Sequence, residues 1–270
     1  MKIVNLLPEH FIEHDYFNLI VENLDKEKFK DRIIILTDNY ERLPVYGDGI
    51  IVLLTAGPEL AKLPLYNKKV RAIFKHHMDQ EVVENVYHMP LTYSHDFKGN
   101  ASTPIKKRKH DVFFSGSRTN RTRFEQEFKK LQSIRKDLNI YANFYDGWMH
   151  NGLKLEEYAE KMSNSKIIIS PHGQVRCECV RFTEAVKCGA AIIAPEHPDC
   201  KAFRECPAVY IKGWKGTLGQ LDMTSPDHLT LSKAIDFCLD NLGTIHDKMK
   251  QSWCNNFSPK AASKLIENAE

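Results

Sequence analysis

The sequence of 270 residues has no apolar run long enough to cross a bilayer. Its longest apolar stretches, residues 49–56 and 166–171, fall far short of the roughly twenty residues that a membrane-spanning helix needs. It also lacks the basic start and apolar run of a signal peptide. These absences predict a soluble, cytoplasmic protein without a membrane span.

The first half of the chain has no cysteine, and the seven cysteines of the second half are odd in number. With no export signal, reduced thiols are expected. Cys177 and Cys179 resemble half of a zinc site, but no second pair follows at a matching distance. We therefore expect no metal site.

The chain also has little net charge, +3, which does not indicate nucleic-acid binding. Residues 1–105 hold 12 Lys and Arg against 15 Asp and Glu, whereas the remaining residues hold 26 against 20. The second part is thus expected to bind any anionic ligand. Residues 106–110 form the densest basic run and are interpreted as a solvated linker.

Residues 1–100 contain short apolar strands separated by helical or polar stretches. The predicted strands are residues 2–7, 32–37, 49–54, 70–74 and 86–89. Apolar residues at helical spacing, from Tyr16 to Leu24, predict a helix after the first strand. Nearly continuous apolar strands that alternate with helices indicate a parallel sheet.

Residues 106–255 repeat this pattern. Strands are predicted at residues 111–114, 138–144, 166–170, 190–194 and 208–211. A turn is expected at 115–117, and helices from Thr119 and over 155–162, 178–188 and 231–242, with a last one after Ser258 and Pro259.

The fold class is therefore α/β, with two Rossmann-like doubly wound domains facing across a cleft. The N-terminal, acceptor-side domain is predicted at residues 1–100 and the C-terminal, nucleotide-sugar-binding domain at 106–255. The polar stretch 94–110 marks the boundary, and a C-terminal helix in 256–270 is expected to pack back on the first domain.

Two loops of the second domain are candidates for anion binding, because ligands of parallel sheets lie beyond the carboxyl ends of strands. The first loop, residues 114–123, contains Ser117 and Arg118, and then Arg121 and Arg123. Small residues allow close approach to an anion, and arginines pair with phosphate. A plain capped helix with exposed arginines is the alternative interpretation.

The second loop, residues 170–176, leads into a helix with Arg181 and Glu184. These side chains are three positions apart and share a helix face. The carboxylate is suited to both hydroxyls of a ribose, and the guanidinium to phosphate. A surface ion pair between the two is the alternative.

Taken together, residues 158–173 and 181–193 resemble the nucleotide-sugar half of exostosin-type glycosyltransferases. The shared pattern is a strand, Pro-x-Gly, Arg-x-x-Glu-Ala, then Gly and an apolar strand, and residues 113–117 match the family's Phe-Ser-Gly segment. The resemblance spans roughly residues 86–200. It implies a GT-B glycosyltransferase that uses a nucleoside-diphosphate sugar, usually UDP-linked, with xylose as one donor sugar of the family. The short chain without an anchor is closer to bacterial or large-virus relatives.

Carried over by position, the resemblance implies that Glu184 holds the ribose and that the turn at Pro171 and Gly173 faces the base or ribose. Three residues would lie near the diphosphate: Ser117, Arg118 and Arg181. No Asp-x-Asp pair, the metal signature of the other main glycosyltransferase fold, is present. A metal-independent reaction without a cofactor is therefore expected, with arginines and a helix dipole stabilising the leaving diphosphate.

Inverting transfer to a glycan acceptor requires a general base. Asp79, beside two histidines after the fourth strand, is the first candidate, and His10, after the first strand, is the second. The other candidates are Glu9, His14, Asp15, His76 and His77. Tyr145 and Trp148 are candidates for stacking on base or sugar.

Two other functions remain open on the sequence. One is a nucleotide-sugar epimerase of the same architecture, and the other is a non-catalytic module that binds nucleotide or glycan. A dehydrogenase is disfavoured, because no Gly-x-Gly-x-x-Gly follows the first strand of either domain.

Overall fold

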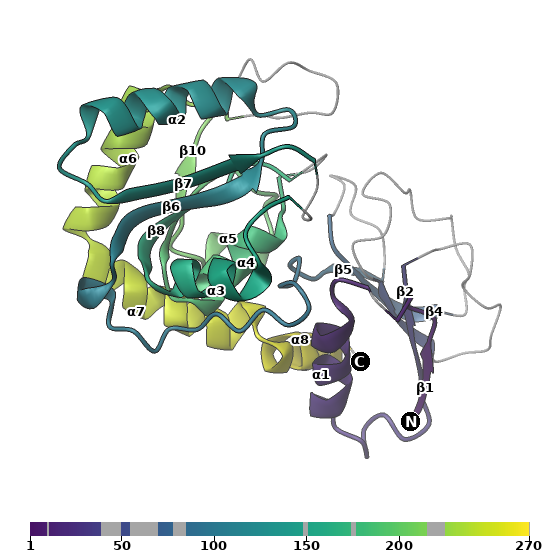
Figure 1. Ribbon diagram of the computed structural model, residues 1–270. Helices are drawn as coiled ribbons and strands as arrows, with labels where there is room; N and C mark the ends of the chain where they lie inside the picture. The colour runs from purple at the N-terminus through teal and green to yellow at the C-terminus, as the bar shows by residue number, and fades with distance from the viewer. Residues whose placement is uncertain are drawn as a thin grey trace. The chain divides into compact units, whose positions relative to one another are not determined.

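The computed structural model describes residues 1–9, 11–38, 50–54, 70–77, 85–147, 151–173, 177–214 and 225–269. The chain divides into two compact units, one of residues 1–95 and 254–270 and the other of residues 96–253 (Figure 1). Among these described residues, each unit contains a sheet of five strands whose pairs are parallel. The predicted fold class, two Rossmann-like α/β domains with parallel sheets, is confirmed.

The first sheet consists of β1(Lys2–Asn5), β2(Ile33–Thr37), β3(Ile50–Leu54), β4(Val70–Lys75) and β5(Val86–His88). These strands pair in chain order, β1-β2-β3-β4-β5. The described strands of this sheet show no reversal of order, in contrast to the second sheet. Apolar runs such as Ile34 to Leu36 show that a strand is buried, but not which strand lies beside it.

Two helices from opposite ends of the sequence pack together in the first unit (Figure 1). Helix α1(His14–Asn23) buries one apolar face, and α8(Pro259–Asn268) begins after Ser258, whose side chain accepts a hydrogen bond from the Ala261 amide. The Tyr16 hydroxyl donates to the Phe257 carbonyl at 2.7 Å, and Ser263 Oγ donates to the Ile20 carbonyl at 2.8 Å. Residues 254–270 are thus part of this unit.

The second sheet consists of β6(His110–Ser117), β7(Ile140–Tyr145), β8(Ser165–Ile169), β9(Ala191–Pro195) and β10(Val209–Ile211). Its order is β10-β9-β8-β6-β7. Because β7 lies on one side of β6 and all later strands lie on the other, the order reverses between β6 and β8. This unit is doubly wound.

The helical elements of the second unit are η2(Ile105–Lys107), α2(Thr122–Ile134), α3(Leu155–Ser163), α4(Val180–Lys187), α5(Lys201–Arg204), α6(His228–Asp240) and α7(Leu242–Ser252), and a π-helical turn, η3(Trp253–Phe257), follows. The expected helix over 231–242 ends at Asp240, and α7 and α5 were not predicted. The expected turn at 115–117 is wrong as well, since these residues extend β6 and pair with Asn143 to Tyr145 of β7.

Part of the basic run 106–110 is buried, in contrast to the predicted solvated linker. Arg108 is 3% exposed and donates to the carbonyls of Thr103, Ser165 and Cys188 at 3.2, 2.9 and 2.6 Å. Burial lowers the pKa of Arg108 to about 10. His110 is also buried, at the start of β6. The charge pattern identifies cations but not the distant carbonyls that bind them.

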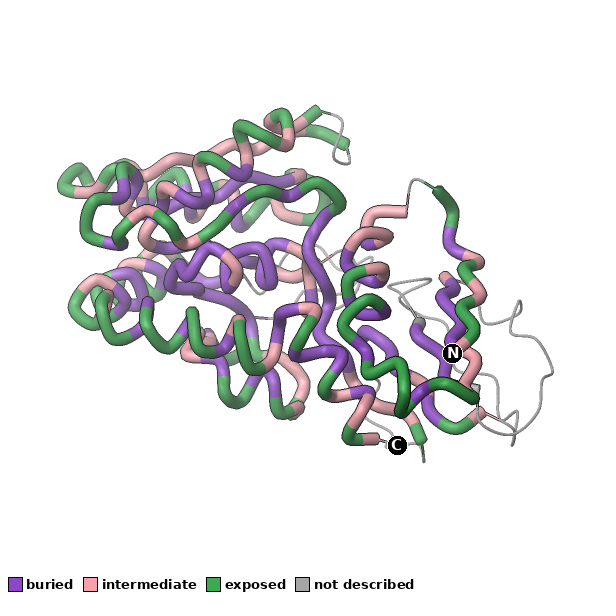
Figure 2. Tube along the Cα trace, turned by 90° about the horizontal axis from the view of Figure 1, so that it is seen from below, coloured by how far each residue is buried: buried purple, intermediate pink, exposed green. Residues whose placement is uncertain are grey.

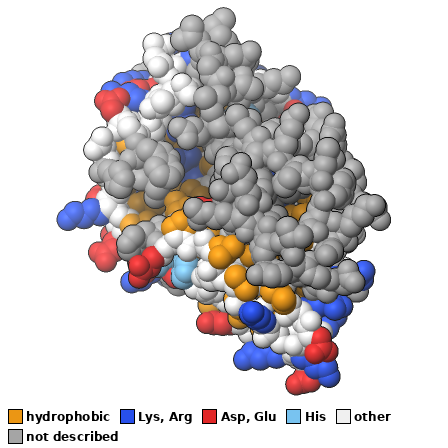
Figure 3. Space-filling view, turned by 90° about the vertical axis from the view of Figure 1, so that its right-hand side faces the viewer, with side chains coloured by type: hydrophobic (Ala, Val, Ile, Leu, Met, Phe, Trp, Pro, Cys, Tyr) orange, Lys and Arg blue, Asp and Glu red, His pale blue; other side chains and the backbone are white. Residues whose placement is uncertain are grey.

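Buried residues concentrate in strands such as β2, β6, β8 and β9, whereas the outward faces of the helices are exposed (Figure 2). On the face drawn in Figure 3, basic and acidic side chains of the described residues are interspersed. No helix in the described part of the chain is long and apolar enough to cross a membrane.

Candidate functional site

The candidate site lies in the second unit, where the strand order reverses between β6 and β8. In open parallel sheets, ligands bind beyond the carboxyl ends of the strands at such a point. Strand β6 ends at Ser117, and β8 is followed by the loop with Pro171 and Gly173. Helix α4 begins at Val180 and carries both Arg181 and Glu184.

Arg181 is a buried cation, 9% exposed, that packs against the end of β6. Its Nη2 donates to the Ser115 carbonyl at 2.7 Å, and its guanidinium carbon lies 4.9 Å from the centre of the Phe114 ring. Gly116 makes room for it, because a Cβ there would lie 2.6 Å from Nη2. Burial lowers the pKa of Arg181, but the surrounding ionisable groups, Tyr158 foremost, raise it more, so that the side chain remains charged.

The charge of Arg181 is not neutralised by an ion pair in the described part of the chain. Its Nη1 faces Cys179 Sγ at 3.9 Å, and among the described residues its buried Nε has no hydrogen-bond partner. A buried charge is costly without such compensation. The arrangement therefore suits an anionic ligand.

Glu184 lies one helical turn after Arg181 and is 1% exposed. The Tyr158 hydroxyl donates to its Oε2 at 2.8 Å. Burial, and then the charge of Glu184, raise the pKa of Tyr158 well above its usual value, so the hydroxyl remains a donor. Since Arg181 and Glu184 are both buried, the alternative of a surface ion pair is wrong.

Arg121 joins the loops that follow β6 and β8. Its Nη1 donates to the Ser117 carbonyl at 2.9 Å and its Nη2 to the His172 carbonyl at 2.5 Å. His172 Nε2 in turn lies 2.6 Å from the Trp214 carbonyl. The structure thus brings Ser117 and the loop of Pro171 and Gly173 together through a guanidinium bridge.

Arg118 lies at the edge of this site and is exposed. Its Nη2 donates to the Phe144 carbonyl at 3.2 Å, and its Nε lies 3.6 Å from Glu125 and 3.5 Å from Asp146. Ser117 Oγ is hydrogen-bonded to Thr119 Oγ1 at 3.0 Å. Arg118 therefore contacts acidic groups on the β7 side of β6, whereas Arg181 occupies the β8 side.

The two predicted catalytic residues, His10 and Asp79, lie outside the described residues, as does Trp148. The first unit holds a buried polar group in which His76 was a candidate base from the sequence, whereas its partners Glu13 and Thr92 were not identified. Thr92 Oγ1 donates to Glu13 Oε1 at 2.6 Å, and His76 Nε2 lies 3.3 Å from the same oxygen. Glu13 directly precedes helix α1, and a carboxylate at the start of a helix is common without any functional role, so the sequence alone did not single it out.

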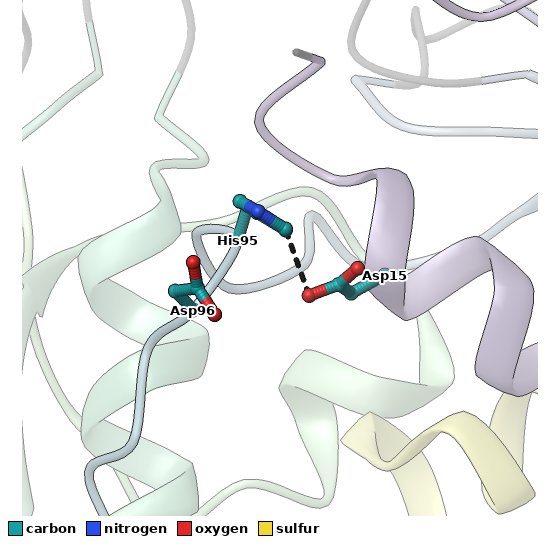
Figure 4. Close-up of side chains that lie close together, drawn as sticks. All are labelled: Asp15, His95 and Asp96. Atoms are coloured by element: carbon teal, nitrogen blue, oxygen red, sulfur yellow. Dashed lines mark ion pairs between the residues drawn. The ribbon is translucent and has the colours of Figure 1, made fainter. Parts of the chain in front are cut away.

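Among the described residues, side chains of types that can ligate a metal gather near the surface around Asp15 and His95. His95 Nδ1 and Asp15 Oδ2 form an ion pair at 2.7 Å, with both side chains almost half exposed, 48% and 44% (Figure 4). Asp96, also labelled there, is the next residue and begins the second unit. An exposed ion pair accounts for the first two side chains without a metal.

Two Rossmann-like domains with parallel sheets are the fold of GT-B glycosyltransferases. No family model matches the chain, and no curated protein matches it. The exostosin resemblance therefore rests on the residues quoted above.

Solved structures do match in fold. AviGT4, a glycosyltransferase involved in avilamycin A biosynthesis, is 10% identical with a TM-score of 0.51, and the match covers 98% of this chain and 91% of that one. The GtfA/B complex is 9% identical with a TM-score of 0.50, and the match covers 96% of this chain and 60% of that one.

Proposed function

We propose that the chain is a glycosyltransferase that transfers a sugar from a nucleoside-diphosphate donor, a UDP-sugar, to a glycan acceptor. The observation that carries the proposal is the buried guanidinium of Arg181, without an ion-pair partner in the described part of the chain, one turn before a buried carboxylate where the strand order reverses. The fold likeness to a glycosyltransferase of avilamycin A biosynthesis supports the same class.

In this proposal the donor's diphosphate lies near Arg181, Ser117 and Arg118, at the start of α4. Guanidinium groups and the N-terminal dipole of a helix both stabilise phosphate. Glu184 accepts hydrogen bonds from the ribose, and the turn at Pro171 and Gly173 faces the base or ribose. UDP-xylose is one donor to test, as the resemblance to exostosin-type enzymes suggests.

The proposed reaction is an inverting displacement. An acceptor hydroxyl oxygen forms a bond to the anomeric carbon, the bond from that carbon to the diphosphate oxygen breaks, and the base takes the hydroxyl proton. His10 and Asp79 remain the proposed bases. The charge that develops on UDP is stabilised by Arg181 and the α4 dipole, so no metal ion is required.

Calorimetric titration with UDP, UDP-glucose and UDP-xylose, followed by a UDP-release assay with and without glycan acceptors in EDTA, tests this function. We expect UDP to bind and its release to depend on an acceptor. Arg181→Gln should weaken UDP binding at least tenfold, because a charge-assisted bond is lost. Arg204→Gln is the control, since Arg204 is exposed and paired with Asp199 at 2.9 Å.

Each contrary outcome identifies another function or mechanism. Epimer formation without an acceptor indicates an epimerase, and binding without turnover indicates a non-catalytic module. Activity that is lost in EDTA and restored by manganese contradicts the metal-independent mechanism, and absence of nucleotide binding contradicts the donor site itself.

A further inference from the structure

Tyr158 connects helix α3 to the carboxylate proposed to bind ribose. Its ring lies beside Phe97 and Phe113, with centroids 6.0 and 5.8 Å apart. Its hydroxyl donates to Glu184 Oε2 at 2.8 Å from a helix 26 residues earlier in the chain. The aromatic contacts thus hold the ring while the hydroxyl holds one carboxylate oxygen.

This bond has consequences for what Glu184 can do. A phenol that stays protonated donates its only proton to the carboxylate, which fixes the carboxyl group about its last torsion. An ionised carboxylate has roughly four acceptor directions, so a bond from Tyr158 is compatible with bonds from the two hydroxyls of a ribose. A carboxylate already held in place loses less entropy when a ligand binds.

We infer that Tyr158 is a positioning residue that holds Glu184 for the ribose hydroxyls and thereby sets the preference of the site for a ribonucleotide. The inference rests on the proposed function, because it assumes that a uridine nucleotide occupies this site. The inference predicts that removing the Tyr158 hydroxyl weakens the binding only of nucleotides that carry ribose hydroxyls. A purely structural Tyr158 would instead affect all nucleotides equally.

The test compares UDP with 2′,3′-dideoxyuridine diphosphate, which keeps the base and diphosphate but lacks both hydroxyls. In calorimetric titrations, Tyr158→Phe should bind UDP about tenfold more weakly. Without the Tyr158 hydroxyl, the Glu184 carboxylate is no longer held in position to accept hydrogen bonds from the ribose hydroxyls. The same variant should bind the dideoxy nucleotide within about twofold of wild type. Glu184→Gln should show the same selective loss, and the double variant should lose no more than the larger single loss.

Tyr210→Phe is the matched control, because the Tyr210 hydroxyl donates to the Phe203 carbonyl at 3.0 Å in the same unit and does not contact Glu184. It should leave both affinities unchanged. If Tyr158→Phe loses affinity equally for both nucleotides, or loses no affinity for UDP, the inference about Tyr158 is overturned. The proposed donor site is not affected by that result as long as the wild type binds UDP. If wild type binds no uridine nucleotide, the proposed function fails and this inference fails with it. If Tyr158→Phe does not fold, the selectivity of Glu184→Gln decides.

Discussion

At the scale of single residues, the candidate site depends on a small residue next to a large cation. Arg181 lies over the Phe114 ring and donates a hydrogen bond to the Ser115 carbonyl. Gly116, the next residue of β6, comes just before the end of this strand. Only a residue without a Cβ leaves this space, since an added Cβ would lie 2.6 Å from Nη2 and 3.0 Å from the Phe114 ring. The position of the guanidinium is therefore determined by a strand residue as well as by its own helix.

Gly116→Ala tests this arrangement. The new methyl group should displace Arg181, weaken UDP binding roughly tenfold and destabilise the unit by about 1–3 kcal/mol, as overpacking usually does. Titration calorimetry and thermal unfolding measure the two effects. Gly243→Ala is the control, because a Cβ there meets nothing within 4 Å. Unchanged affinity in Gly116→Ala would show that Arg181 accommodates the methyl group.

The sequence identified Arg181 and Glu184 as a pair but not their surroundings. Spacing within one helix shows that they share a face. It does not show that Glu184 is bonded to Tyr158, or that Arg108 is bonded to carbonyls 57 and 80 residues away. Such contacts depend on how the strands are ordered, and the order is not encoded locally.

At the scale of elements, helices α2 and α6 are connected by one carboxylate. Glu127 Oε2 lies 2.8 Å from His228 Nδ1 and accepts from the His228 amide at 3.2 Å, while Oε1 lies 2.7 Å from Lys130 Nζ. Hydrogen bonds from Lys130 and then from His228 lower the pKa of Glu127 to about 2. His228 is the first residue of α6, so the contact determines where this helix meets α2.

This contact should be sensitive to acid. Because the folded pKa of Glu127 lies below its ordinary value of 4.5, its stabilisation is present above that value and is lost as the pH falls towards 2. Glu127→Gln should lower the free energy of unfolding by about 1–2 kcal/mol at pH 7 and by much less near pH 2.

Urea denaturation of wild type and Glu127→Gln across this pH range measures the difference. Glu160→Gln, at an exposed position of α3, should match wild type throughout. A difference between Glu127→Gln and wild type that does not vary with pH would mean that packing, and not charge, makes the contribution of Glu127.

The sequence predicted where most strands and helices lie better than it predicted how long they are or in which order the strands pair. Every strand that the structure describes was predicted, because short runs rich in Ile, Val and Phe are typical of buried strands. Strand β6 is longer than predicted, since Ser115 to Ser117 pair with β7 although their small polar residues are typical of turns. Helix α7 was not predicted, and Asn241 and Gly243 near its start are residue types that are typical of a helix end.

At the scale of the whole molecule, the chain begins in one unit, forms the other and returns. Residues 254–270 supply α8 to the first unit, where α8 packs on α1 and the Ser263 hydroxyl donates to the Ile20 carbonyl of that helix. The alternation of strands and helices was sufficient to predict two Rossmann-like domains, but not that the first sheet runs in chain order. Apolar patterns determine burial, whereas strand order arises from contacts between distant segments.

The last residues should therefore stabilise the first unit and not the second. Deleting residues 258–270 uncovers the α1 face that packs on α8 and removes the hydrogen bond from the Asp25 amide to Glu267 Oε1, 3.0 Å long. Loss of one buried isoleucine costs about 2 kcal/mol or more, so amides of α1 and β2 should exchange with deuterium much faster. Amides of β8 and β9 should keep their protection, because their sheet lies in the other unit. Deleting only residues 269–270, which follow the end of α8, should leave amide exchange unchanged in both units. Faster exchange in both units would mean that they unfold as one cooperative body.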